Sequence, residues 1–137
     1  MNRSDFIKLS RLRLRDAKVL LTSGNCEGAY YLCGYAVECA LKACIAKRTR
    51  RHDFPDLKTV KDSYTHKLPD LVKVGGLERD LEQRIQGDPK FEVNWALVKD
   101  WSEESRYQQR SHVEAHELYS AVASRKHGVL GWIKEHW

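Results

Sequence analysis

The segment from Cys26 to Thr49 constrains the fold more than any other part of the chain. Its central run, from Ala29 to Val37, has almost no polar face, so the segment predicts a helix that other elements surround. Small side chains recur along it and would let neighbouring helices approach closely: Gly28, Ala29, Gly34, Ala36, Ala40 and Ala43. We therefore expect a helical bundle built around this segment.

All four cysteines lie in the same segment: Cys26, Cys33, Cys39 and Cys44. A straight helix cannot fold back to pair them, which argues against disulfides within the chain. Zinc is not expected either, because Cys39 and Cys44 have the spacing of a ligand pair but no second pair follows. We predict that the cysteines are small buried side chains in a protein of a reducing compartment.

Helical patterns continue on both sides of this segment. From Ser4 to Thr22, apolar side chains repeat at the helical period, and the opposite face carries a cationic stripe of Arg11, Arg15 and Lys18. The stretch from His52 to Tyr64 is expected to be a connecting loop. Shorter helices are expected over residues 65–76, 77–85, 94–107 and 129–133, and a longer one from 111. The predicted fold is all-α, an up-and-down bundle of four main helices with short ancillary helices, in one domain over residues 1–137.

The bulk composition limits where the chain works and what it binds. No stretch approaches the roughly 20 apolar residues that cross a bilayer, and no apolar signal-peptide core follows Met1. We expect a cytoplasmic protein with no membrane contact. The net charge of +5 and a pI near 9.1 favour partners that carry phosphate groups.

Charged side chains within and after the central segment allow two interpretations each. Glu38 and Lys42 stand four residues apart and can pair along the helix, although a functional role for Glu38 stays open. A basic run then follows where cations complement the negative end of the helix dipole. This run forms either a solvated helix end or a phosphate-binding patch, and it comprises Lys47, Arg48, Arg50 and Arg51.

The residues from Ser111 to Glu114 match a capping box, which predicts that a new helix begins there. Arg106 would then end one element and His112 would begin the next, so that the two side chains can converge. On one continuous helix, a six-residue step would instead leave two side chains about 120° apart. That geometry applies to Arg110 and His116, the other pair with this spacing.

His112 and His116 also stand four residues apart on one helix face, as two zinc ligands would. Hydrolytic zinc sites of this kind need a glutamate directly after the first histidine, and Glu114 instead points to the opposite side. We therefore predict surface histidines, with no metal and no cofactor.

The central segment reads GAYYLCGYAVECALKACIAK from Gly28 to Lys47. This resembles the second helix of HEPN (higher eukaryotes and prokaryotes nucleotide-binding) domains, in which an alanine-rich stretch leads to a glutamate and then to Leu-Lys-Ala. Glu38, Leu41, Lys42 and Ala43 occupy those places. The stretches 64–68 and 101–107 look like the family's middle helix and its approach to the last long helix, so that the resemblance covers nearly the whole chain.

The resemblance implies a helical bundle, frequently dimerised, in systems that bind nucleotides or cut RNA. Some members are metal-independent ribonucleases with an Arg-x4-6-His motif, in which residues from both subunits come together across the dimer. Asn, Asp or His usually follows the arginine of that motif directly. Tyr107 stands at this place here. Other members lack the pair and act as antitoxin-like, binding or scaffold modules.

The sequence therefore predicts a homodimeric binding module for nucleotide or RNA phosphates. The system in which we expect it is a toxin–antitoxin or nucleotidyltransferase-associated one, with a nucleotidyltransferase-like partner protein. The expected phosphate contacts come from Arg106, Arg110 and the basic run 47–51. The alternative is an endoribonuclease in which neutral His112 takes the ribose 2′-hydroxyl proton and Arg106 stabilises the charged phosphorane. A structural partner with no nucleic-acid contact is the third hypothesis.

Overall fold

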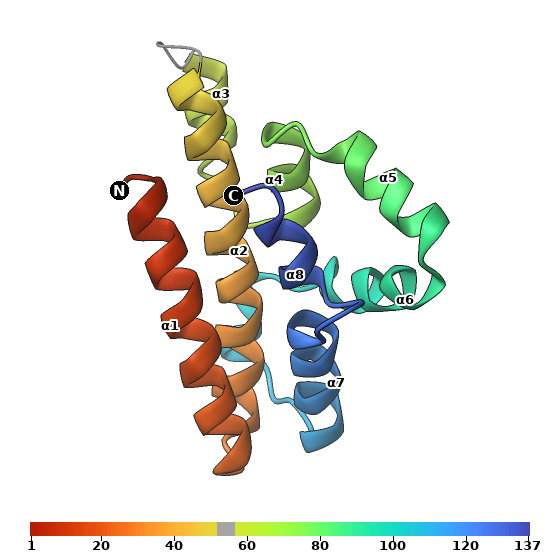
Figure 1. Ribbon diagram of the computed structural model, residues 1–137. Helices are drawn as coiled ribbons and strands as arrows, with labels where there is room; N and C mark the ends of the chain where they lie inside the picture. Colours follow the sequence, from red (N-terminus) through yellow and green to blue (C-terminus); the bar gives the residue numbers. More distant parts are fainter. Residues whose placement is uncertain (52–56) are drawn as a thin grey trace.

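Two long antiparallel helices, α1 (Arg3–Thr22) and α2 (Cys26–Arg51), lie side by side in the computed structural model (Figure 1), which describes residues 1–51 and 57–137. The Asn2 side chain accepts from the backbone N–H of Asp5, and the Asp5 carboxylate accepts in return from the N–H of Asn2, which starts α1. Gly24, with φ +83°, makes the tight turn into α2. The predicted helices at 4–22 and 26–49 are thus confirmed.

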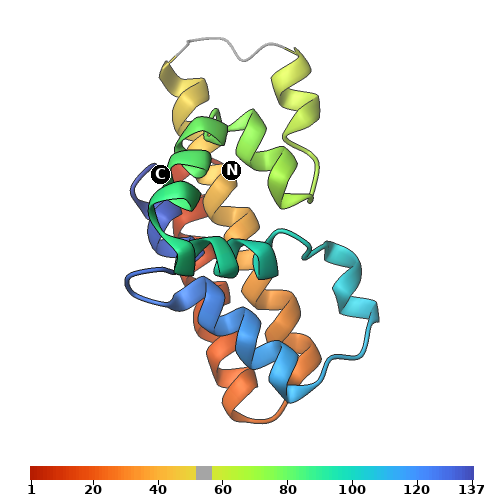
Figure 2. The same cartoon turned by 90° about the vertical axis from the view of Figure 1, so that its right-hand side faces the viewer.

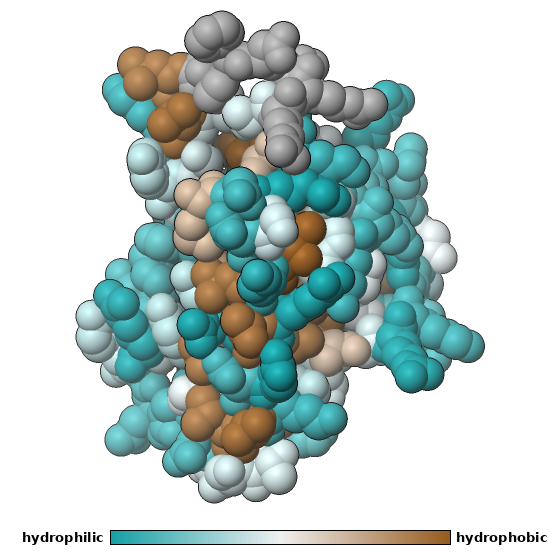
Figure 3. All heavy atoms as spheres, turned by 60° about the vertical axis from the view of Figure 1, so that its left-hand side comes forward, coloured by the Kyte–Doolittle hydropathy of each residue, from teal (hydrophilic) through white to brown (hydrophobic). Residues whose placement is uncertain are grey.

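The two faces of α1 differ as the sequence predicts. Ala17 and Leu21 are buried against α2, and the buried Ser10 hydroxyl donates to the carbonyl of Ala36 at 2.7 Å. The cationic stripe of Arg11, Arg15 and Lys18 is exposed. Figure 3, in which the α1 side of the molecule comes forward, shows hydrophilic side chains beside apolar ones on this face.

The remaining elements pack either on α2 or on one another (Figures 1 and 2). They are α3 (Leu57–Asp62), α4 (Leu68–Val74), α5 (Glu78–Gly87), α6 (Pro89–Val98), the 3-10 helix η1 (Glu103–Tyr107), α7 (His112–Ala123) and α8 (Val129–Lys134). Every regular element in 1–51 and 57–137 is helical, which confirms the all-α bundle. The core runs the length of α2, from Cys26 to Ile45, and includes Leu68, Phe91, Leu118 and Ile133. No helix in these ranges is long and apolar enough to cross a membrane.

The cysteines are free and buried along α2, as predicted for small core side chains. Burial raises the pKa of Cys39 to about 11 and the pKa of Cys44 to about 12, and it raises the pKa of Cys33 further. These thiols stay protonated at neutral pH. They are packing groups rather than nucleophiles.

Two sequence predictions of secondary structure were wrong. The helix expected over 94–107 is two elements. α6 begins earlier, at Pro89, because Asp88 caps it, and it ends at Val98, whereas residues 103–107 form η1. The loop expected over 52–64 contains α3, a six-residue helix with no buried residue and therefore without an apolar pattern that would mark it.

Trp101 explains why α6 ends early. Its side chain is buried against Gly34 of α2, where an added Cβ atom would lie 2.2 Å from the indole Nε1. Tyr31 lies beside the same indole, with ring centroids 6.0 Å apart. The segment between α6 and η1 leaves the helical path so that this ring can fill the space above the glycine.

Asp88 also ties α6 to the turn before α8. Its carboxylate lies 2.8 Å from His127 Nδ1 and accepts from Arg84 Nε at 3.3 Å. The hydrogen bond with His127 is the main cause that holds the pKa of Asp88 below its ordinary value. Asn94 donates to the carbonyl of His127 at 2.8 Å, so that two side chains fix this turn.

Candidate functional site

The start of α7 is built as the sequence predicts. The Ser111 hydroxyl accepts from the backbone N–H of Glu114 at 3.1 Å, and the Glu114 carboxylate accepts from the N–H of Ser111 at 3.2 Å. The bond from Ser111 is the main cause that lowers the pKa of Glu114. α7 begins at His112, so Arg106 on η1 and His112 belong to different elements.

Arg106 and Tyr107 form an exposed pair at the end of η1. The guanidinium carbon of Arg106 lies 4.8 Å from the centroid of the Tyr107 ring, and Tyr107 is 78% exposed. Among the described residues, no hydrogen bond or ion pair engages the Arg106 guanidinium. A flat cation and an aromatic ring are therefore both open to a ligand at this place.

His112 and His116 occupy the first two turns of α7, with ring centroids 5.9 Å apart, and both are exposed. No hydrogen bond joins His112 to Arg106 within the ranges that the structure describes. No group of three or more His, Cys, Asp or Glu side chains gathers there in a metal-binding arrangement either. The pair on α7 alone does not make a zinc site.

Arg110 differs from Arg106, because its guanidinium is already engaged. Its guanidinium carbon lies 4.2 Å from the ring centroid of Tyr30 on α2, and its Nη1 donates to Glu114 at 3.1 Å. Arg110 thus anchors the segment before α7 to α2. The sequence showed the charge of Arg110 but gave no signal for this contact with an aromatic ring eighty residues earlier.

The basic run at the end of α2 is a separate place. Lys47 and Arg48 are exposed and line a hollow of about 360 Å³ with Gly75, Gly76 and His136, and Arg48 donates to the carbonyl of Val74 at 3.3 Å. The side chains of Arg50 and Arg51 lie outside the described residues. Lys47 follows Tyr30 by seventeen residues on α2, which at about 1.5 Å per residue separates this run from Arg110 by roughly 25 Å.

Glu38 has a second partner that the sequence did not reveal. The predicted pair with Lys42 is present, with Nζ 3.3 Å from Oε2, and His66 Nδ1 lies 2.9 Å from Oε1. Glu38 is 2% exposed, so its charge depends on these two groups. The residue thus holds the segment before α4 against α2.

The described elements form an all-helical bundle with an exposed Arg–Tyr pair at the end of η1. The HEPN domain family matches residues 4–135, nearly the whole chain. The chain belongs to the HEPN family, whose members have functions related to nucleotides and RNA. No curated protein and no solved structure matches the chain.

Proposed function

We propose that this chain is a HEPN-domain binding module that contacts nucleotide or RNA phosphates. The exposed Arg106–Tyr107 pair carries the proposal, because it offers a cation for a phosphate and a ring on which a base can stack. His112 and His116 are also exposed, on the helix that follows. Lys47 and Arg48 form a second basic site. A long RNA can contact this site and the Arg106–Tyr107 pair at once, whereas a mononucleotide is too short to do so.

The proposed assembly is a homodimer. Val93 and Leu97 on α6 and Val113 on α7 are exposed apolar side chains, and Leu97 lines a small hollow together with Glu114. A second copy that covers this apolar surface would bring two Arg106–Tyr107 pairs into one assembly. A nucleotidyltransferase-like partner, in a toxin–antitoxin or related system, is part of the same proposal. A cytoplasmic location suits it, since the four cysteines are free.

Binding of a labelled single-stranded RNA is expected to weaken about tenfold in Tyr107→Ala, since one stacked base contributes roughly 1–3 kcal/mol. The logarithm of the binding constant falls linearly with the logarithm of the salt concentration. In Arg106→Ala this slope should be shallower by about one unit, because one phosphate contact is lost. Fluorescence anisotropy across a salt series measures both quantities.

Matched controls are available on surfaces away from the pair. Tyr64→Ala removes another exposed tyrosine, and Arg125→Ala removes an exposed arginine in the turn after α7. Both should bind the RNA as the wild type does. If Tyr107→Ala and Arg106→Ala also bind like the wild type, the proposed site is wrong.

Endoribonuclease activity is the second candidate function, and the break between η1 and α7 is the observation that favours it. With His112 as base and Arg106 as phosphorane stabiliser, RNA should be cleaved in the presence of EDTA, and cleavage should be lost in His112→Ala and Arg106→Ala. His116→Ala is the control that should still cleave. Intact RNA after long incubation with wild-type dimer would leave binding as the function, and loss in His116→Ala alone would contradict the assigned pair.

A further inference from the structure

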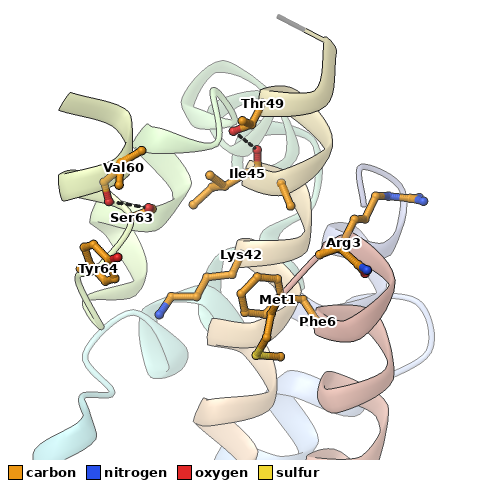
Figure 4. A pocket seen from close by; sticks show the side chains of 11 residues that line it. Met1, Arg3, Phe6, Lys42, Ile45, Thr49, Val60, Ser63 and Tyr64 are labelled. Carbon is orange, nitrogen blue, oxygen red and sulfur yellow. Dashed lines mark hydrogen bonds between the residues drawn. The ribbon is translucent and has the colours of Figure 1, made fainter. Parts of the chain in front are cut away.

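A cavity of about 650 Å³ lies away from the proposed RNA surface, between the start of α1, the second half of α2 and the α3 region. Its volume is in the range of sites that hold small organic ligands, roughly 300–1,000 Å³. Apolar side chains from all three elements line it, among them Phe6, Ile45, Val60 and the ring of Tyr64. Figure 4 shows these side chains around a shared space.

Lys42 is a charged group that reaches into this space. Figure 4 shows its side chain extending from α2 towards Tyr64, beside Phe6, whereas Arg3 points away. Its side chain is 17% exposed, and its ammonium group donates to Glu38 at 3.3 Å. An ammonium group has three N–H donors, and Glu38 is its one hydrogen-bond partner in the described parts of the chain, so two donors remain for a ligand.

The charges around the cavity favour an anion. The ionisable side chains that line it among those described are Arg3, Lys42 and Tyr64, and no carboxylate is among the lining side chains. Glu38 lies behind Lys42 and is shared with His66 Nδ1 at 2.9 Å, so that the carboxylate holds the lysine in place without facing the cavity itself. A half-buried cation beside apolar walls binds an anionic group more strongly than a fully exposed lysine does.

We propose that this cavity binds a small amphipathic anion, with its apolar body against Phe6, Ile45, Val60 and Tyr64 and its carboxylate, sulfonate or phosphate group on Lys42. The site is independent of the Arg106–Tyr107 surface. Lys42 follows Tyr30, the residue under Arg110, by twelve residues on α2, which is roughly 18 Å along the helix axis.

Two fluorescent probes that differ mainly in charge test the proposal. Anilinonaphthalene sulfonate is anionic, and N-phenylnaphthylamine has nearly the same aromatic body without charge. The folded protein should bind one molecule of either probe, the anionic one more tightly. Lys42→Met should weaken the anionic probe about tenfold and change the neutral probe less than about twofold, since only the charge-assisted contact is removed.

Tyr64→Ala should weaken both probes severalfold, because it removes part of the apolar wall at a residue that is 75% exposed and does not endanger folding. Lys47→Met, at an exposed lysine of the same helix that does not line the cavity, and Tyr107→Ala are matched controls that should bind both probes like the wild type. Lys42→Met retains the contact between Glu38 and His66, and circular dichroism checks that it folds.

Several results would overturn the cavity site: no saturable binding to the wild type, equal loss of the anionic probe in Lys47→Met, or unchanged binding of both probes in Tyr64→Ala. None of these results bears on RNA binding, which depends on Arg106 and Tyr107. The two proposals can therefore fail separately.

Discussion

Replacing Gly34 with alanine is expected to destabilise the fold by about 2 kcal/mol, although alanine is the better helix former. The new Cβ atom would lie 2.2–2.3 Å from three atoms of the Trp101 indole, which is a rigid ring buried on all sides. The indole must leave its place or α2 must shift, and either change costs more than the roughly 1 kcal/mol that alanine gains in helix propensity. Urea denaturation followed by circular dichroism measures the difference.

Gly28→Ala is the matched control on the same helix. Its Cβ atom would approach Leu20 Cδ1 at 3.1 Å, which is the end of a flexible side chain that can move by a few tenths of an ångström. This variant should be as stable as the wild type or more stable by up to about 1 kcal/mol. Equal stabilities of Gly34→Ala and the wild type would show that Trp101 does not occupy the space above Gly34.

Removing both side chains that pair with Glu38 is expected to destabilise the protein by about 3 kcal/mol or more. In the double variant Lys42→Met with His66→Leu, the carboxylate keeps its buried position, at 2% exposure, but loses both partners. The large cost comes from the unpaired buried charge rather than from the attraction that is lost.

Adding Glu38→Met to this double variant should recover most of the lost stability. The triple variant replaces the whole charged group with apolar side chains of similar size, and such replacements are often neutral or stabilising. Chemical denaturation of the four proteins, wild type included, provides the comparison. A triple variant that is no more stable than the double variant would contradict the assigned role of the unpaired carboxylate.

Features of the chain that depend on neighbours in sequence could be predicted. The pair of Glu38 and Lys42 follows from their four-residue spacing, and the start of α7 follows from Ser111 and Glu114. Both rules describe interactions inside one helix. The length and apolar character of α2 likewise identified it as the centre of the bundle.

Features that depend on distant parts of the chain could not be predicted. Asn94 to Tyr107 has a helical pattern, yet the space above Gly34 takes up Trp101 and ends α6 at Val98, because tertiary packing overrides local preference. His66 meets Glu38 across 28 residues, and no local pattern marks that contact.

The candidate site shows the same limit. Arg106 and Arg110 look alike in sequence, four residues apart and equally charged. Only the fold distinguishes them, since Arg110 stacks on Tyr30 whereas Arg106 lies on the exposed Tyr107. Charge alone cannot show whether a cation is available to a ligand or already serves the structure.

Trp101 and Arg110 both rest on one turn of α2, the first against Gly34 and the second over Tyr30. The intervening residues, 102–109, thus form a loop whose two ends are both held against the same turn of the rigid helix α2. Because its two ends are held by other contacts, the exposed positions of this loop, 104 and 106–109, can change at small cost to the fold. Diversification of ligand preference in such a protein can therefore concentrate there, while the buried Ser105 and the helices stay as they are.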